Sequence, residues 1–244
     1  MKDVSIIIPA AGEGKRLGKT STPKPFILFK VATESREGKV RGKRIPLVLI
    51  TLQRFLHLPE VREIIIAIHP RYLQRASKLI KNKVMEKRIK LVKGGKRRPD
   101  SVANALKIID PKSRIILVHD AARPLVSPNL IRRIIKATRK YGAVLPALPV
   151  TDTIKRVNLH LNRVKETIKP RQELYISQTP QGFQREILIK AYARVNPAKR
   201  DLTDEAAAVE GIGYPVKIVA GDPKNLKLTT PLDKFIIRKL LNSY

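Results

Sequence analysis

The sequence contains no cysteine and no tryptophan, and only 5% of its 244 residues are aromatic. Without cysteine, the chain has no disulfide bonds, no thiolate metal ligands and no cysteine nucleophile. The scarcity of aromatic side chains leaves few platforms on which nucleic-acid bases could stack. No apolar run approaches the roughly 20 residues that a membrane helix needs. Because no export signal precedes the first apolar run, 4–8, we expect a cytoplasmic protein outside the membrane.

Negative charge is also scarce. The chain has 51 Lys and Arg residues against 20 Asp and Glu residues, which gives a formal net charge of +31. Such an excess predicts an anionic partner, either nucleic acid or a phosphate-bearing substrate. The basic residues are spread along the whole chain instead of being gathered in one tail or helix. This distribution favours a phosphate-handling enzyme, although composition alone leaves a basic nucleic-acid-binding protein open.

Short apolar runs alternate with amphipathic stretches, which is typical of a parallel sheet covered by helices. The length suits one domain over residues 1–244. We therefore expect an α/β fold with a single Rossmann-like, mostly parallel sheet and helices on both faces. The apolar runs are 4–8, 64–68, 89–92, 115–118 and 143–148, and the expected helices span about 47–57, 71–83, 100–109 and 128–140.

Two segments break this alternation. Residues 30–44 have no apolar periodicity and are mostly basic where charged, so we expect a solvated basic insertion there. Residues 151–169 contain two extended stretches around a polar turn at 158–162. This pattern predicts a β-hairpin arm that projects from the sheet.

A glycine-rich basic loop, AAGEGKRLGKTSTPK (residues 10–24), follows the first apolar run. Its glycines let backbone N–H groups approach an anion, and Arg16 and Lys24 add positive charge. A strand followed by such a loop predicts phosphate binding. The loop matches neither a P-loop nor a dinucleotide fingerprint, because Glu13 and Leu17 stand where those patterns need glycine. A tight turn with incidental lysines is the alternative.

Seven further motifs follow the loop. They are GGKRRPDSV (94–102), HDAARP (119–124), PVTDTIKR (149–156), IKPRQELY (168–175), QTPQ (178–181), LTDEAAAVE (202–210) and GDPKNLKLT (221–229). The loop resembles the signature of sugar-phosphate nucleotidyltransferases, and the whole series resembles the 2-C-methyl-D-erythritol 4-phosphate cytidylyltransferase family. The resemblance implies transfer of CMP from CTP to that polyol phosphate in the non-mevalonate isoprenoid pathway. A cytidylyltransferase for another polyol phosphate, such as ribitol 5-phosphate, is the nearest alternative.

The resemblance also implies roles for particular residues. Four basic residues correspond to catalytic positions: Arg16, Lys24, Arg171 and Lys227. The residues that correspond to nucleotide-binding positions are Ala10, Ala11, Gly12, Gly14, Gly94, Gly95, Arg98, Ser101 and Ala121. Those that correspond to positions binding the acceptor are Arg123, Thr153 and Thr179.

Asp120 follows the buried run 115–118, at the edge where open α/β sheets bind ligands. A carboxylate there can hold Mg²⁺, which prefers oxygen ligands and bridges substrate phosphates. A turn or helix-capping aspartate is the alternative. Asp222 is the candidate for a second metal ligand, whereas we expect His119 to pack against the sheet. Lys96 stands where the family often has an acid, so recognition of the base would rest on backbone groups.

The resemblance further implies a homodimer, because in that family the hairpin arm packs against a second subunit. Asp152, Thr153, Lys155 and Arg171 would then act across the interface. No general base is expected, since the acceptor phosphate is mostly dianionic at pH 7. The four histidines show no Ser/His/Asp arrangement in the sequence, which agrees with this chemistry.

Overall fold

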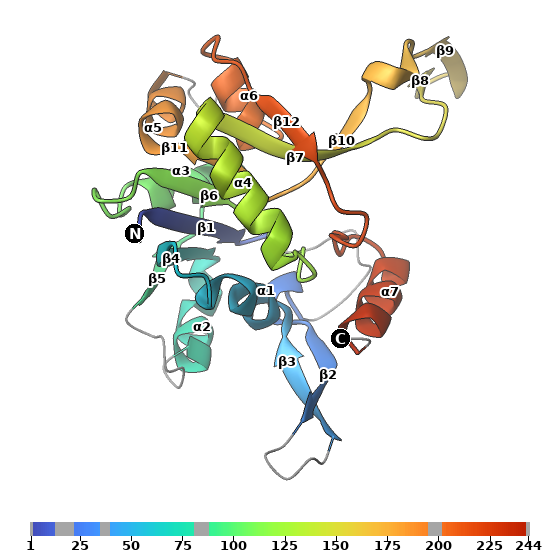
Figure 1. Ribbon diagram of the computed structural model, residues 1–244. Helices are drawn as coiled ribbons and strands as arrows, with labels where there is room; N and C mark the ends of the chain where they lie inside the picture. Colours follow the sequence, from blue (N-terminus) through green and yellow to red (C-terminus); the bar gives the residue numbers. More distant parts are fainter. Residues whose placement is uncertain (1, 13–21, 35–39, 81–87, 195–201, 243–244) are drawn as a thin grey trace.

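The computed structural model describes residues 2–12, 22–34, 40–80, 88–194 and 202–242 (Figure 1). A sheet of eight strands runs through the molecule in the order β10-β7-β11-β6-β1-β4-β5, and β12 pairs with β7 as well. The expected mostly parallel sheet is confirmed, because only β10 and β11 run antiparallel to their neighbours. The strands are β1 (Val4–Ala10), β4 (Val61–Ile68), β5 (Ile89–Lys93), β6 (Ile115–Val118), β7 (Ala143–Pro149), β10 (Tyr175–Ser177), β11 (Gln181–Gln184) and β12 (Lys217–Ala220).

Helices cover both faces of this sheet, as expected. Successive residues of a strand point to opposite faces, so β1 places Ile6 and Ile8 in one apolar cluster and Ile7 in another. The first cluster is covered by α1 (Leu47–Leu56), α2 (Leu73–Ile80) and α4 (Pro128–Tyr141). The second is covered by α3 (Arg98–Leu106), α5 (Arg185–Arg194) and α6 (Glu205–Glu210).

The segment expected as a solvated basic insertion, 30–44, contains regular structure. This segment belongs to an antiparallel pair, β2 (Leu28–Glu34) and β3 (Val40–Pro46), whose connecting residues lie outside the described ones. Phe29 is buried and packs in a third apolar cluster with residues of α1 and of α7 (Pro231–Leu241). Lys30, in contrast, is exposed. Because basic residues dominate the sequence of this pair, its few inward-facing apolar residues gave no recognisable alternating pattern.

The predicted hairpin arm at 151–169 is confirmed. β8 (Lys155–Asn158) and β9 (Arg163–Thr167) pair antiparallel and project beyond the ends of β7 and β10 (Figure 1). Oδ1 of Asn158 accepts hydrogen bonds from the backbone N–H groups of His160 and Leu161, which closes the turn. Five large apolar side chains of the arm are exposed: Ile154, Val157, Leu159, Leu161 and Val164. Within the described segments, no helix combines the length and the apolar character needed to span a bilayer.

Candidate active site

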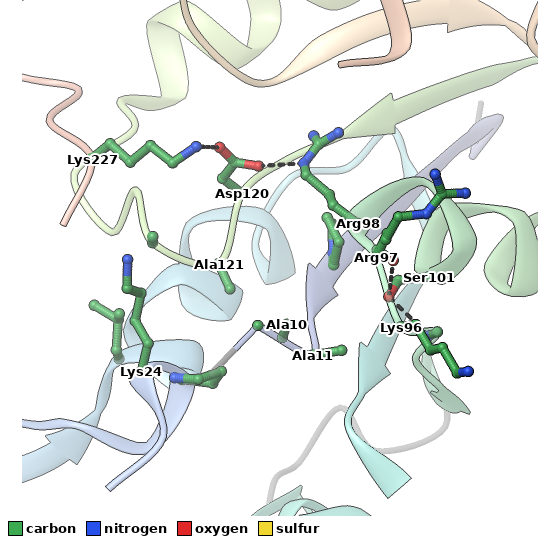
Figure 2. A pocket seen from close by; sticks show the side chains of 16 residues that line it. Ala10, Ala11, Lys24, Lys96, Arg97, Arg98, Ser101, Asp120, Ala121 and Lys227 are labelled. Atoms are coloured by element: carbon green, nitrogen blue, oxygen red, sulfur yellow. Dashed lines mark hydrogen bonds and ion pairs between the residues drawn. The ribbon is translucent and has the colours of Figure 1, made fainter. Parts of the chain in front are cut away.

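A pocket opens where β1 and β6 end, beside the first turn of α3 (Figure 2). β1 lies between β4 and β6, so the chain leaves the ends of these strands in opposite directions and a crevice remains between them. Lys227 and Lys24, the first residue of the short helix η2 (Lys24–Phe26), lie on one side of the pocket, and Arg97 and Arg98 lie on the other (Figure 2). Among the described residues, the predicted positions that line this pocket are Ala10, Ala11, Gly12, Lys24, Gly95, Arg98, Ser101, Asp120, Ala121 and Lys227.

The lining is strongly cationic. Among its described residues, Asp120 is the single carboxylate. The cationic side chains around it are Lys24, Lys96, Arg97, Arg98 and Lys227. A crevice lined by one sign of charge concentrates ligands of the opposite sign. The lining therefore suits a ligand that carries several phosphate groups.

Asp120 is held from two sides. Its Oδ1 accepts a hydrogen bond of 3.0 Å from Nε of Arg98, and Nζ of Lys227 lies 2.7 Å from its Oδ2. Nε of Arg123 lies 4.0 Å from Oδ2 on the buried side. Burial alone would raise the pKa of Asp120, but Arg98 and Lys227 hold that pKa well below its usual range. The carboxylate is therefore a permanent negative charge and cannot exchange protons at neutral pH.

A hydrogen-bonded chain supports Asp120 from beneath. Its backbone N–H donates to Oγ1 of Thr179 at 3.0 Å, and that hydroxyl lies 3.1 Å from Nδ1 of His119. Nε2 of His119 lies 3.0 Å from the carbonyl oxygen of Arg123. A carbonyl oxygen only accepts, so Nε2 carries the proton and Nδ1 accepts from Thr179. Burial lowers the pKa of His119 to about 4, so this ring is neutral at pH 7 and its hydrogen bonds to Thr179 and Arg123 are preserved.

His119 was expected to pack against the sheet, and the structure places its ring against Phe55 of α1. Its ring is fully buried and meets the ring of Phe55 edge to face, with 5.0 Å between the centroids. His119 thus supports the backbone at Asp120 and does not reach the pocket.

The two glycines after β5 allow close packing at the base of the pocket. A Cβ at Gly94 would lie 2.4 Å from Cβ of Ala11, and one at Gly95 would lie 2.2 Å from Cβ of Asp100. Such distances exclude a side chain unless the backbone shifts. Oγ of Ser101 accepts a hydrogen bond of 3.0 Å from the N–H of Gly95. The predicted nucleotide-binding serine is 1% exposed, so it acts mainly on the shape of this loop.

Two residues predicted to bind the acceptor, Thr179 and Arg123, lie beneath the pocket and do not line it. The hydroxyl of Thr179 is occupied by Asp120 and His119, as described above. Nη1 of Arg123 donates to the carbonyl oxygen of Asn225 at 2.8 Å. Both side chains therefore support the walls of the pocket through hydrogen bonds. Motif matching cannot distinguish such a supporting residue from one that binds the ligand.

Asp222, predicted as a second metal ligand, is likewise outside the pocket lining. Its Oδ2 accepts from Oγ of Ser127 at 3.3 Å, and its Oδ1 accepts from the backbone N–H of Lys224 at 2.9 Å. Its carboxylate thus binds the start of α4 and its own turn, and the prediction finds no support in this geometry.

The remaining predicted residues lie elsewhere. Arg16 and Gly14 fall outside the described residues. Arg171 and Thr153 are exposed near the arm, and Nη1 of Arg171 donates to the carbonyl oxygen of Thr151 at 3.0 Å. Gly94 borders a neighbouring hollow that also includes Ala11, Gly12, Gly95 and Lys96. A single chain therefore does not bring Arg171 or Thr153 to Asp120.

Sequence reasoning missed Glu205, whose carboxylate binds both terminal nitrogens of Arg98. It lies in the motif LTDEAAAVE (202–210), but the resemblance gave it no role, and in the structure it is the first residue of the short helix EAAAVE. An acid that begins such a helix next to buried alanines needs a cationic partner. The sequence offered no means to identify that partner as Arg98.

Comparisons with known proteins agree across nearly the whole chain. A family model described as IspD, 2-C-methyl-D-erythritol 4-phosphate cytidylyltransferase, matches residues 4–242. A protein of that name from Alkaliphilus metalliredigens is 39% identical over 242 residues, which are 98% of this chain and 93% of the relative. A crystal structure of that name from Thermus thermophilus has a TM-score of 0.72 and 30% identity, covering 98% of both chains. The 4-diphosphocytidyl-2C-methyl-D-erythritol synthase structure from Anaerococcus prevotii has a TM-score of 0.77 and 28% identity, again covering 98% of both chains.

Proposed function

The chain belongs to the 2-C-methyl-D-erythritol 4-phosphate cytidylyltransferase family, and from that premise we propose that the pocket around Asp120 is its catalytic site. The enzyme transfers CMP from CTP to 2-C-methyl-D-erythritol 4-phosphate in isoprenoid synthesis, giving 4-diphosphocytidyl-2-C-methyl-D-erythritol and pyrophosphate. One observation carries the location of the site: a buried carboxylate bound by Arg98 and Lys227 in a pocket otherwise lined by cations.

The reaction brings two polyanions together. A phosphate oxygen of the acceptor attacks the α-phosphorus of CTP, and a new P–O bond forms as the bond to pyrophosphate breaks. The electron pair of the broken bond leaves with pyrophosphate. The acceptor phosphate has a second pKa of about 6 and is mostly dianionic at pH 7, so no protein group has to remove a proton. The enzyme has to position the reactants and stabilise their charge.

Lys24 and Lys227 are suited to that task. The amine of Lys227 lies against Asp120, and its side chain is 39% exposed, so substrate can reach it. Lys24 lies on the same side of the pocket (Figure 2). We assign both lysines to the phosphate groups at the reacting centre and the backbone at Ala11, Gly12 and Gly95 to the nucleotide. Arg16 remains a prediction for the same electrostatic role as Lys24.

The donor set fits a magnesium ion that arrives with CTP. In the described part of the chain, no three His, Cys, Asp or Glu side chains gather into a site of their own. Mg²⁺ often binds through one or two carboxylates together with substrate phosphates, and the ionised Asp120 offers one. When bound, Mg²⁺ would neutralise phosphate charge. Asp120 would be the protein residue that holds the ion.

We also propose that the working form is a homodimer in the cytoplasm, where CTP is available. The arm carries exposed apolar side chains, and Leu159 alone is 85% exposed. An isologous contact around a twofold axis would cover such a surface on both subunits. Arg171 and Thr153 would then reach the acceptor in the partner's pocket, which explains why neither lines the pocket of its own chain.

Pyrophosphate release tests the proposal. The purified protein is mixed with CTP and Mg²⁺, and 2-C-methyl-D-erythritol 4-phosphate and ribitol 5-phosphate are offered separately. Rapid release with the first acceptor alone is the expected result. Release with ribitol 5-phosphate alone would keep the mechanism but change the acceptor. No release with either acceptor from folded protein would reject the assignment of this pocket.

A further inference from the structure

Glu205 begins α6, and its side chain is completely buried. Its Oε1 and Oε2 accept hydrogen bonds from Nη1 and Nη2 of Arg98 at 2.7 and 2.9 Å. The hydroxyl of Tyr192 donates to Oε1 at 3.1 Å. The carboxylate lies behind Arg98 and does not line the pocket, so the reaction described above gives it no direct role.

Arg98 connects this carboxylate to Asp120. Its Nε donates to Asp120, while both Nη atoms donate to Glu205. The guanidinium is planar, so it cannot rotate without breaking two charge-assisted hydrogen bonds to Glu205. The guanidinium is therefore held in a fixed orientation by its three hydrogen bonds to carboxylates.

The two oxygens of Asp120 consequently have unequal partners. Oδ1 is bound by Arg98, which is 25% exposed and fixed by Glu205. Oδ2 is bound by Lys227, which is 39% exposed. A lysine ammonium sits on a flexible stem and interacts as a point charge, so it can change partners by rotating that stem.

We infer that Glu205 is a positioning residue, which locks Arg98 onto one oxygen of Asp120 and leaves Lys227 as the partner that exchanges between Asp120 and a substrate phosphate. This inference rests on the proposed function of the pocket. Without the Glu205 carboxylate, the Nη groups of Arg98 lose their acceptors. They would then be able to turn toward the triphosphate of bound CTP and away from the orientation that holds Asp120. CTP would bind as tightly as before, but Asp120 and Lys227 would be misplaced for the reaction.

The substitution Glu205→Gln tests this inference, because glutamine keeps the size of the side chain and removes its charge. We expect kcat for pyrophosphate release to fall about 100-fold, the usual order of loss for a misplacement of about 1 Å. The KM for CTP should stay unchanged or fall, which is the sign of a lost transition-state arrangement and not of lost binding. A purely structural role would reduce the amount of folded protein and leave kcat per folded molecule unchanged.

The matched control is Glu210→Gln, which alters the exposed glutamate at the other end of α6 and should leave both constants at wild-type values.

A double-mutant cycle shows whether Glu205 acts through Arg98. In an Arg98→Lys background, adding Glu205→Gln should change kcat by less than about twofold, because the paired hydrogen bonds between residues 98 and 205 are already lost. Tyr192→Phe provides a milder variant that folds if Glu205→Gln does not. It removes one hydrogen bond to Glu205 and should lower kcat about fivefold with no rise in KM.

Three results would overturn the inference: a wild-type kcat in Glu205→Gln, a KM for CTP that rises in step with the loss of kcat, or additive effects in the cycle. Each presupposes turnover by the wild-type protein. If the wild-type protein releases no pyrophosphate, the proposed function itself has failed.

Discussion

The side-chain amine of Lys24 donates a hydrogen bond of 2.7 Å to the backbone carbonyl oxygen of Leu228. The two residues are 204 positions apart in the sequence, yet they meet at the pocket. Lys227, the neighbour of Leu228, contacts Asp120. The contact therefore holds the segment that follows the phosphate loop against the segment that carries the second lysine. Both lysines are thus held on the same side of the pocket (Figure 2).

Replacing Lys24 by alanine should lower kcat at least as strongly as it raises the KM for CTP. The loss should be about 10²- to 10³-fold in kcat, the usual effect of removing a group that stabilises developing charge. Steady-state pyrophosphate release measures both constants. Lys30→Ala, at an exposed position of β2, is the matched control and should behave as wild type. If turnover persisted and KM alone changed, Lys24 would be a binding residue only.

Asp120→Asn removes one negative charge and little else. Arg98, Lys227 and Arg123 would then face a neutral amide in a buried setting. Breaking a buried ion pair in this way costs about 3–5 kcal/mol, so the free energy of unfolding should fall by roughly 3 kcal/mol as turnover disappears. Urea unfolding and kinetics measure the two effects. The control Asp110→Asn alters a surface ion pair with Arg62 and should leave turnover and the free energy of unfolding almost unchanged. An active and stable Asp120→Asn protein would contradict the assignment of Asp120 to the catalytic site.

Removal of divalent cations with EDTA should abolish turnover without unfolding the protein. The described residues contain no closed set of metal ligands, and the fold is held by apolar clusters on both faces of the sheet. Added Mg²⁺ should restore full activity. Circular dichroism melts with and without EDTA check the stability, and a large drop in melting temperature would mean that a metal has a structural role as well.

The stability of the metal-free protein should depend on pH through His119. The pKa of this ring is about 4 in the folded state, against its ordinary value of 6.5, so the unfolded chain binds the proton more readily. The contribution is fully present above pH 6.5 and is lost as the pH falls from 6.5 to 4, by up to about 3 kcal/mol. His119→Gln should flatten this part of the profile in urea unfolding measured with EDTA present. The control His57→Gln, at an exposed position, should retain the wild-type slope, and equal slopes in all three proteins would contradict the prediction.

The arm should join two subunits. Light scattering at micromolar concentration should give twice the chain mass of 27.5 kDa, and Leu159→Glu should shift the protein to monomer and abolish turnover. Leu232→Glu places the same charge at an exposed position of α7 and should leave the dimer intact.

Mixing inactive Lys24→Ala and Arg171→Ala chains should restore about a quarter of the activity, because one intact shared site forms in each mixed dimer. A monomeric wild type with full turnover would remove the dimer proposal.

The sequence predicted five of the eight strands of the sheet, because each contains a continuous apolar run, which is typical of parallel strands. Each of the five runs is the core of a strand: β1, β4, β5, β6 or β7. The strands β10 and β12 gave no such signal, since all but one of their residues are exposed. The ends of α4 could be predicted from local chemistry alone. Oγ of Ser127 accepts from the N–H of Leu130, and Gly142 has a φ of 81° after the helix. That residues 1–244 form a single domain stays a prediction.

Motif matching indicated Asp120, Lys24 and Lys227, and all three line one pocket in the structure. It could not indicate that Thr179 and Arg123 support Asp120 from below, because a motif does not record which way a side chain points. Those orientations are set by hydrogen bonds between segments that are distant in the chain.

Each of the sheet strands is made before residues 227 and 228, which complete one side of the pocket. A chain cut just before residue 227 would therefore keep these strands but lack the second lysine, and it would be catalytically silent. Proteolytic trimming from the C-terminal side would likewise abolish activity before it removed any strand of the sheet.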